Sequence, residues 1–235
     1  MNEDFTIIHI DETDSTNHWL MQQRDPCVVV ADYQTAGKGC GSNTWESERG
    51  KNLTFSMLIH PESLLASRQF RITEVTSVAL CETLEDNLLQ QVTIKWPNDI
   101  YVGDRKLCGM LIENRLQGSV IKDSIIGIGL NVNQRVFQSD APNPVSLCQL
   151  LDRELSREAL LQAFLIRFSA VWNREDVSAC YRQRLYRKGE YHPYSDASGP
   201  FTAMLTDVLP DGRLLLVDKE SHERIYHFKE VQFLI

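Results

Sequence analysis

Three stretches of the chain carry groups that could act on phosphorus. Residues 37–45 read Gly-Lys-Gly-Cys-Gly-Ser-Asn-Thr-Trp, residues 95–99 read Lys-Trp-Pro-Asn-Asp, and Lys106 follows shortly afterwards. Glycines leave backbone N–H groups free to face an anion, and a lysine stabilises negative charge that develops at a phosphorus centre. We therefore predict nucleotide chemistry on a carboxylic acid.

The glycine loop lies between two strands that are predicted at Cys27–Tyr33 and Asn52–His60. This connection is far longer than a tight hairpin, and connections of such length are usually either disordered or functional. Lys38 could add charge beside the phosphates, and Trp45 offers a flat face on which an adenine ring can stack. A mobile surface loop is the alternative explanation for the glycines taken alone.

The run 95–99 places polar groups just past the end of a strand. Pro97 favours extended geometry at Trp96 and ends the strand, so that Asn98 and Asp99 project beyond the sheet. A carboxylate in that position can hold Mg²⁺ beside phosphates or accept a proton from an incoming amine. An ordinary turn after a strand would also use Asn and Asp.

Lys106 lies early on the return strand of a predicted hairpin. Period-two alternation places Cys108 on the same face of that strand. Two chemistries stay open here: a lysine that neutralises charge at phosphorus, and an acyl transferase in which Cys108 is the nucleophile. Gly127 and Gly129 weaken a strand unless something approaches its backbone closely, and a bound ligand would do so.

The composition narrows the class of protein. The 235 residues carry a formal net charge of -8 with a pI near 5.3, which argues against binding of nucleic acid or of an anionic membrane. No apolar run has membrane-spanning length, and the acidic start of the sequence lacks the features of a secretory signal. The 6 cysteines have neither metal-site nor dithiol spacing. We expect reduced thiols and a cytoplasmic protein.

Hydrophobic patterns predict an α+β fold in which a mixed β-sheet is flanked by helices. Further strands are expected at Phe5–Ile10, Val92–Trp96, Ile100–Val102, Lys106–Glu113 and Ile125–Val132, and helices at His18–Gln23, at Glu62–Gln91 and from Ser156 towards Tyr186. After Gly189 the pattern changes to short β segments. We predict two domains, residues 1–188 and a small β-barrel over residues 189–235.

On these motifs the chain resembles the biotin protein ligases, also called biotin-[acetyl-CoA-carboxylase] ligases. The resemblance extends over nearly the whole chain and implies a catalytic domain of the class II aminoacyl-tRNA-synthetase and biotin-ligase type, followed by an SH3-like barrel. It rests on Ser15-Thr16-Asn17, Gln34, the loop to Trp45, the run 95–99, Arg105-Lys106-Leu107-Cys108-Gly109 and Gly127-Ile128-Gly129-Leu130-Asn131-Val132-Asn133.

The resemblance implies a two-step reaction. Biotin and ATP with Mg²⁺ give biotinyl-5′-adenylate and pyrophosphate, and biotin then passes to a lysine of a biotin carboxyl carrier protein or domain. By resemblance Lys106 and Asp99 are catalytic, and Asp99 is the expected Mg²⁺ ligand. The residues expected to bind biotin are Ser15, Thr16, Asn17, Gln34, Lys38, Gly39, Cys40, Lys106 and Gly129. Those expected to bind the nucleotide are Gly37, Lys38, Gly39, Cys40, Trp45, Asn98, Asp99, Lys106 and Asn131.

Two departures from the family pattern carry expectations of their own. Cys40 stands where the usual Gly-Arg-Gly-Arg-Arg-Gly-Arg loop has its second arginine, which implies weaker retention of the adenylate. Some members carry a DNA-binding winged helix before the catalytic domain, whereas the first catalytic strand here begins by about Phe5, so we expect no repressor function. Family members dimerise through sheet edges, and the sequence leaves a homodimer open. A lipoate-protein ligase and a biotin-binding protein without turnover are the alternatives.

Overall fold

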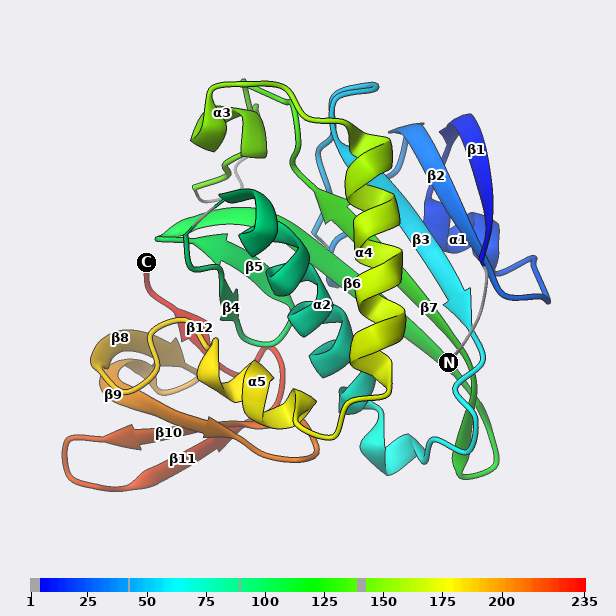
Figure 1. The fold of residues 1–235 in the computed structure, drawn as a ribbon. Coiled ribbons are helices and arrows are strands. Elements are labelled where there is room, and N and C mark those ends of the chain that lie inside the picture. Colours follow the sequence, from blue (N-terminus) through cyan, green and yellow to red (C-terminus); the bar gives the residue numbers. More distant parts are fainter. Residues whose placement is uncertain (1–4, 42, 89, 139–142) are drawn as a thin grey trace.

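The computed structural model describes residues 5–41, 43–88, 90–138 and 143–235. A seven-stranded sheet forms the centre, in the strand order β1-β2-β3-β7-β6-β5-β4, and helices cover one of its faces (Figure 1). β1 and β2 run parallel and the other paired strands of this sheet run antiparallel, which confirms the predicted mixed sheet. Its strands are β1 (Thr6–Thr13), β2 (Cys27–Gln34), β3 (Leu53–Ile59), β4 (Thr93–Lys95), β5 (Asp99–Val102), β6 (Arg105–Gln117) and β7 (Val120–Leu130).

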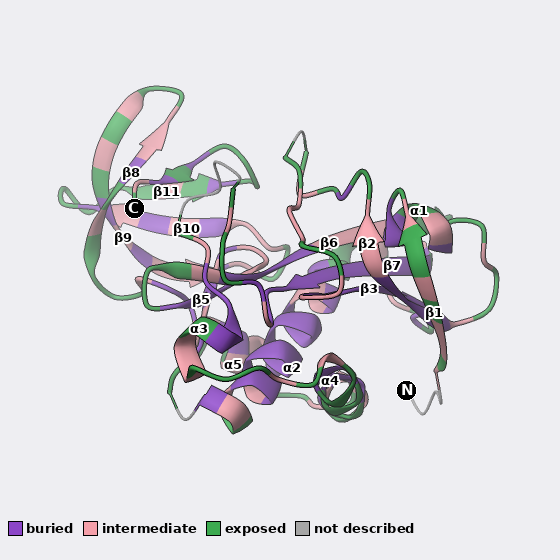
Figure 2. Ribbon diagram, turned by 90° about the horizontal axis from the view of Figure 1, so that it is seen from above, coloured by how far each residue is buried: buried purple, intermediate pink, exposed green. Residues whose placement is uncertain are grey.

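The core lies between this sheet and the helices α2 (Phe70–Leu88) and α4 (Arg157–Trp172). β3 is buried along its whole length, and α2 is buried over most of its surface (Figure 2). The Phe55 ring of β3 meets the Phe164 ring of α4 edge to face, with 5.5 Å between the ring centroids. Because successive side chains of a strand point to opposite faces, the sheet gives one face to this core. The other face packs in part on the short helix α1 (Thr16–Leu20) through a smaller apolar cluster.

The predicted start is correct for the long helix α4 and wrong for the long helix α2. α4 begins as predicted, because the Ser156 hydroxyl accepts a hydrogen bond of 3.2 Å from the Ala159 N–H. α2 begins at Phe70, well after the predicted start at Glu62. The segment before it pairs with the start of β7, where the Ile121 N–H donates to a backbone carbonyl at 2.8 Å, and this tertiary pairing replaces helix.

Two short elements were not predicted. The helix α3 (Leu147–Leu151) is held by a capping box, in which Ser146 and Gln149 satisfy each other's backbone N–H groups. The strand β8 (Tyr191–Asp196) contains Pro193, and proline is uncommon inside a strand. The short helices α1 (Thr16–Leu20) and α5 (Val177–Gln183) lie close to their predicted places.

A second, five-stranded antiparallel sheet follows in the order β11-β10-β9-β8-β12, as Figure 1 shows at the C-terminal end of the chain. Its first strand begins near residue 189, where the sequence predicts a division. The Trp96 indole N–H donates to the Gly212 carbonyl at 2.9 Å, and the Phe228 ring meets Trp96 edge to face. The second sheet therefore packs directly on the run 95–99. Its other strands are β9 (Gly199–Val208), β10 (Leu214–Asp218), β11 (Glu223–Tyr226) and β12 (Gln232–Phe233).

None of the helices in the described part of the chain combines the length and the apolar character needed to cross a bilayer.

Candidate active site

A pocket of about 970 Å³ opens on the face of the sheet opposite the long helices. Its walls come from the glycine loop, the start of α1, the ends of β5, β6 and β7, and the segment 228–233 of the second sheet. The pocket brings together all but one of the residues predicted for the site. These are Ser15, Thr16, Asn17, Gln34, Lys38, Gly39, Cys40, Trp45, Asn98, Asp99, Lys106, Gly129 and Asn131.

Gly37 is the exception, because it does not line the pocket. A Cβ atom at this position would lie 2.7 Å from the Trp45 carbonyl oxygen and 3.0 Å from Gln34 Nε2. The Trp45 N–H donates to the Gly37 carbonyl at 2.9 Å, and the Gly39 N–H donates to the Asn43 carbonyl at 2.8 Å. The glycine loop is thus a narrow hairpin, and Gly37 is needed for the close approach of its two arms.

One row of paired residues across the sheet forms the pocket floor. Thr54 of β3 pairs with Gly129 of β7, Gly129 pairs with Gly109 of β6, and Gly109 pairs with Asp99 of β5. The two glycines leave the backbone bare between the polar ends of the row. A ligand or a side chain can therefore approach the sheet closely at this point.

The Trp45 indole occupies this bare floor. A Cβ atom at Gly129 would overlap the indole ring, and one at Gly109 would lie 2.9 Å from Trp45 Cζ3. Similarly, a Cβ atom at Gly127 would overlap the Asn17 amide. The close approach that the sequence predicted for Gly127 and Gly129 therefore comes from side chains of this chain. The buried Trp45 Nε1 has no hydrogen-bond partner among the described residues, so it is available to a ligand.

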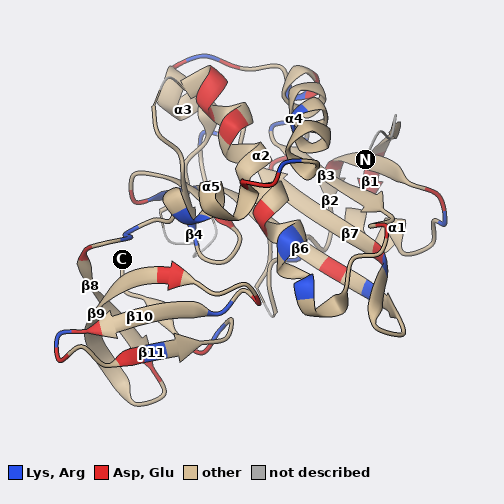
Figure 3. Ribbon diagram, turned by 60° about the horizontal axis from the view of Figure 1, so that its bottom comes forward, with Lys and Arg blue, Asp and Glu red and all other residues tan. Residues whose placement is uncertain are grey.

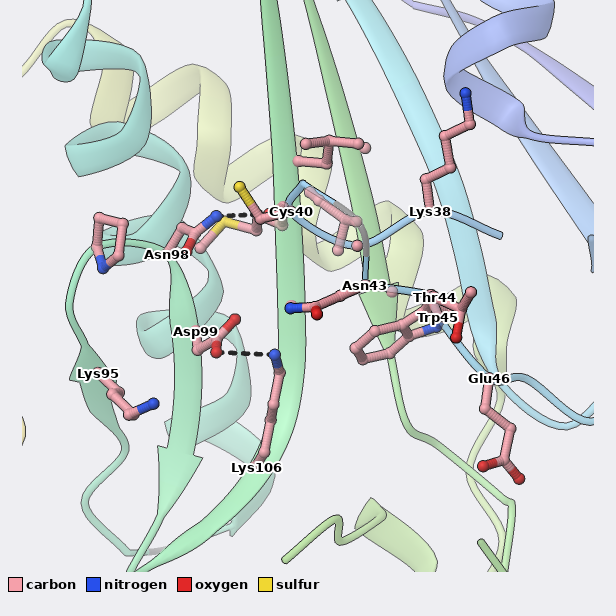
Figure 4. Close-up of a pocket in the computed structure, with 18 of the residues that line it drawn as sticks. Lys38, Cys40, Asn43, Thr44, Trp45, Glu46, Lys95, Asn98, Asp99 and Lys106 are labelled. Atoms are coloured by element: carbon pink, nitrogen blue, oxygen red, sulfur yellow. Dashed lines mark hydrogen bonds and ion pairs between the residues drawn. The ribbon is translucent and has the colours of Figure 1, made fainter. Parts of the chain in front are cut away.

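Lys106 and Asp99 form an ion pair above one end of the floor. Lys106 Nζ lies 2.7 Å from Asp99 Oδ2, and the two side chains are 24% and 23% exposed (Figure 4). Lys106 Nζ also lies 5.7 Å from the centroid of the Trp45 ring. β6, which carries Lys106, bears residues of both charge signs (Figure 3). Partial burial excludes much of the water that would otherwise screen this cation from a bound anion.

A β-bulge overturns the expectation that Cys108 shares the face of Lys106. Lys106 pairs with Tyr101 and Cys108 with Ile100, so one extra residue of β6 lies between the two pairs. Gly109 faces the pocket instead, whereas Cys108 is fully buried in the core. Burial also raises the pKa of the Cys108 thiol, which keeps it protonated. The acyl-transferase hypothesis with Cys108 as the nucleophile is therefore wrong.

A second lysine stands beside this pair. Lys95 of β4 pairs with Asp99 of β5, and Lys95 Nζ lies 5.3 Å from the centroid of the Phe233 ring of the second sheet. Burial lowers the pKa of Lys95, and the charge of Asp99 opposes that effect. The sequence places Lys95 in the motif but gives it no role. The structure adds it to the wall of the pocket.

Oxygen acceptors line the same pocket and fit a magnesium ion bound beside phosphates. Asn98 Nδ2 donates to the Met110 carbonyl at 2.6 Å, which leaves the Asn98 amide oxygen free to accept. Asn131 Nδ2 donates to the Val145 carbonyl, while its buried oxygen lacks a partner among the described residues. Amide and carboxylate oxygens are hard ligands of the kind that Mg²⁺ takes when phosphates and waters complete its shell. Asp99 adds the carboxylate.

Hydrogen bonds fix the far wall of the pocket at the start of α1. The Thr16 N–H and hydroxyl both donate to Gln34 Oε1, at 2.8 and 3.0 Å. Ser56 Oγ lies 2.6 Å from both Thr16 Oγ1 and Asn17 Oδ1. The Asn17 amide also donates to Glu113, so both ends of that amide are engaged within the protein. Asn17 therefore positions α1, whereas the Ser15 hydroxyl makes no capping bond and is available.

The rest of the glycine loop lies at the rim. The side chain of Lys38 extends away from the Asp99–Lys106 pair, as Figure 4 shows. Burial raises the pKa of the Cys40 thiol, and the nearby charge of Lys229 partly offsets this. Lys229 belongs to the second sheet and lines the pocket, although no sequence signal singled it out.

Comparison with known proteins identifies the family of the chain. The biotin/lipoate A/B protein ligase family matches residues 8–131 of the chain. The bifunctional ligase/repressor BirA of Bacillus subtilis (strain 168) is 33% identical over 230 residues, which covers 92% of this chain and 70% of the relative. The human biotin–protein ligase is 36% identical over 110 residues, or 45% of this chain and 15% of that protein. Hence the chain belongs to the biotin/lipoate A/B protein ligase family.

The structural comparison is more specific. The biotin protein ligase from Aquifex aeolicus, solved in complex with biotin and ATP, superimposes with a TM-score of 0.82 at 25% identity. The match covers 97% of this chain and 99% of that one. Within the family, therefore, this chain is an enzyme of the biotin protein ligase type.

Proposed function

We propose that this protein is an ATP-dependent biotin protein ligase, which forms biotinyl-5′-adenylate and then biotinylates a lysine of a biotin carboxyl carrier protein or domain. The observation that carries the proposal is the ion pair of Lys106 with Asp99, held at 2.7 Å beside the glycine hairpin in one pocket. A carboxylate does not condense usefully with an ammonium group in water. Its activation as a mixed anhydride therefore comes first.

In the first step a carboxylate oxygen of biotin attacks the α-phosphorus of ATP, and pyrophosphate leaves. Negative charge develops on the α-phosphate oxygens, and Lys106 stabilises that charge from its place above the bare floor of the pocket. Asp99 directs the Lys106 ammonium group through their ion pair. Magnesium, held by Asp99 with Asn98 and Asn131 as further oxygen donors, would neutralise phosphate charge.

At the other end of the pocket, Ser15, Thr16 and Gln34 hold the ureido and ring atoms of biotin. The support is that these groups converge there, with the Ser15 hydroxyl unused in capping. Backbone groups of Gly129 and of residues 38–40 complete the biotin site. Asn17 contributes by fixing α1.

In the second step the ε-amine of the acceptor lysine attacks the acyl carbon of the adenylate, and AMP leaves. The amine must lose a proton for this attack. Asp99 lies in the pocket with one carboxylate oxygen outside its bond to Lys106 and is our candidate for the base. Trp45, which lies on the pocket floor in this structure, moves over the reacting groups and limits hydrolysis of the anhydride.

One experiment tests the proposed function. The protein is incubated with ATP, Mg²⁺ and a biotin carboxyl carrier domain, with biotin or lipoate, and the carrier is weighed by mass spectrometry. We expect the mass of one biotinyl group on one lysine, and no lipoyl group on a lipoyl carrier domain. Lipoylation in place of biotinylation would identify a lipoate-protein ligase. Biotin binding without any modified carrier would identify a binding protein.

We also propose a domain organisation, an assembly and a location for the protein. Residues 1–188 form the catalytic domain and residues 189–235 the small barrel domain. None of the residues of the edge strand β1 is buried, which leaves that edge open for a homodimer. The net charge of -8 disfavours binding to DNA, so we propose a ligase without repressor function. The location we propose is cytoplasmic, a reducing compartment that suits the six free cysteines.

A further inference from the structure

The second sheet contributes a cation to the pocket that no motif explains. Lys229 lies in the turn between β11 and β12 and lines the pocket together with residues of the central sheet. Among the residues that the structure describes, no carboxylate lies within ion-pair distance of its ammonium group. The adjacent Glu230 carboxylate instead accepts a hydrogen bond of 2.6 Å from the His227 N–H.

Lys229 sits against the tip of the glycine hairpin. A Cβ atom placed on Gly41 would overlap Lys229 Nζ and would lie 2.9 Å from Lys229 Cε. Gly41 therefore has to be bare for this contact. Lys106 of the central sheet lines the same pocket as Lys229.

The backbone holds Lys229 in an unfavourable conformation. Its φ angle is 71°, in the left-handed region that residues with a Cβ atom rarely adopt. The turn keeps it there through the His227–Glu230 hydrogen bonds. A strained residue that aims an unpaired charge into a ligand pocket is the pattern expected of a binding residue.

The charges of the pocket also point to an anionic ligand. On a chain of net charge -8, the pocket gathers four lysines and only two carboxylates among the lining residues that the structure describes. These are Lys38, Lys95, Lys106 and Lys229, with Glu46 and Asp99.

We propose that Lys229 binds the polyphosphate of the nucleotide and so joins the second sheet to the first step of the reaction. This inference rests on the proposed ligase function. The bound phosphates lie between Lys106 on the central sheet and Lys229 on the second sheet. Nucleotide binding thereby clamps the glycine hairpin against the turn between β11 and β12.

The test compares variants at 229 with a matched surface lysine. Lys229→Ala removes the charge. Lys229→Asn also removes the charge, and asparagine tolerates the positive φ angle of this position. Lys229→Arg keeps the charge. Lys219→Ala removes an exposed lysine from the neighbouring turn between β10 and β11, outside the pocket. Biotin-dependent exchange of labelled pyrophosphate into ATP gives KM for ATP, KM for biotin and kcat.

We expect Lys229→Ala and Lys229→Asn to raise KM for ATP about tenfold, equal to about 1.4 kcal/mol, with KM for biotin unchanged. Added salt should shrink the difference because Lys229 is exposed. Lys229→Arg and Lys219→Ala should resemble the wild type. An unchanged KM for ATP in both charge-removing variants overturns the inference.

Titration calorimetry with Mg²⁺ and ATP separates this inference from the proposed function. A wild type that binds ATP but modifies no carrier contradicts the function alone, and the affinities of the variants at position 229 then decide the inference without turnover. A wild type with no affinity for ATP contradicts both.

Discussion

Replacement of Lys106 by methionine is the sharpest perturbation of the proposed chemistry. Methionine has a similar unbranched shape and removes only the charge. The ammonium group lies 2.7 Å from Asp99 Oδ2, and its side chain is 24% exposed, so the cation is partly shielded from water. We expect adenylate formation to slow by about a thousandfold, for the electrostatic reason that follows.

The magnitude follows from Coulomb's law. A unit charge about 4 Å from the developing charge, with an effective dielectric constant of about 20, is worth about 4 kcal/mol, or about a thousandfold in rate. The loss of stability should be far smaller, about 1 kcal/mol or less, because a partly exposed ion pair contributes little to folding. Asp99 also keeps a cationic neighbour, since Lys95 pairs with it in the sheet.

The assay is single-turnover formation of the adenylate under saturating ATP and biotin. Arg105→Met is the matched control, because it removes an exposed cation next to Lys106 on the same strand and outside the pocket. Both variants should melt close to the wild type. A rate for Lys106→Met within tenfold of the Arg105→Met rate would refute the assignment of Lys106 to charge stabilisation.

Three further outcomes are expected. Trp45→Ala removes the ring that is proposed to cover the reacting groups, so more adenylate should be hydrolysed per biotin transferred, measured as AMP released without carrier modification; an unchanged ratio would exclude the lid role. Asp99→Asn should slow transfer to the carrier, measured by mixing preformed adenylate–enzyme complex with carrier; normal adenylation together with normal transfer would exclude Asp99 as the base. Burial raises the pKa of Glu74, so the wild type loses stability as pH rises from the ordinary glutamate pKa through the raised one. Glu74→Gln should therefore raise Tm by a few degrees at pH 8 but not at pH 4, unlike the exposed control Glu62→Gln, and equal shifts at both pH values would contradict this.

The strands of the central sheet could be predicted because their local pattern agrees with their environment. The runs that became β2 and β3 are rich in β-branched and apolar residues, and both are buried on each face over most of their length. Ser156 is equally local, since a helix start needs only an acceptor three residues before an N–H group. Local patterns do not show which distant segments meet in the fold. The family resemblance supplied this, because it predicted that the separate motifs form one pocket.

The errors arose where a distant segment decided the local structure. The residues before Phe70 have helical spacing, but their backbone pairs with the start of β7. The bulge in β6 moves Cys108 into the core. Ile100 pairs with Cys108, but the next residue, Tyr101, pairs with Lys106, so Leu107 is left without a partner on β5. Neither pairing leaves a trace in the sequence of a single strand.

The second sheet is part of the site for the same reason. Trp96 belongs to a motif that ends a strand of the central sheet, yet its indole N–H donates to the Gly212 carbonyl and its ring meets Phe228. One residue further, Pro97 leads into the asparagine and aspartate of the pocket. The second sheet therefore contacts the motif three residues before Asp99. Because Lys229 follows Phe228 directly, one short turn supplies both the ring that packs on Trp96 and a cation of the pocket.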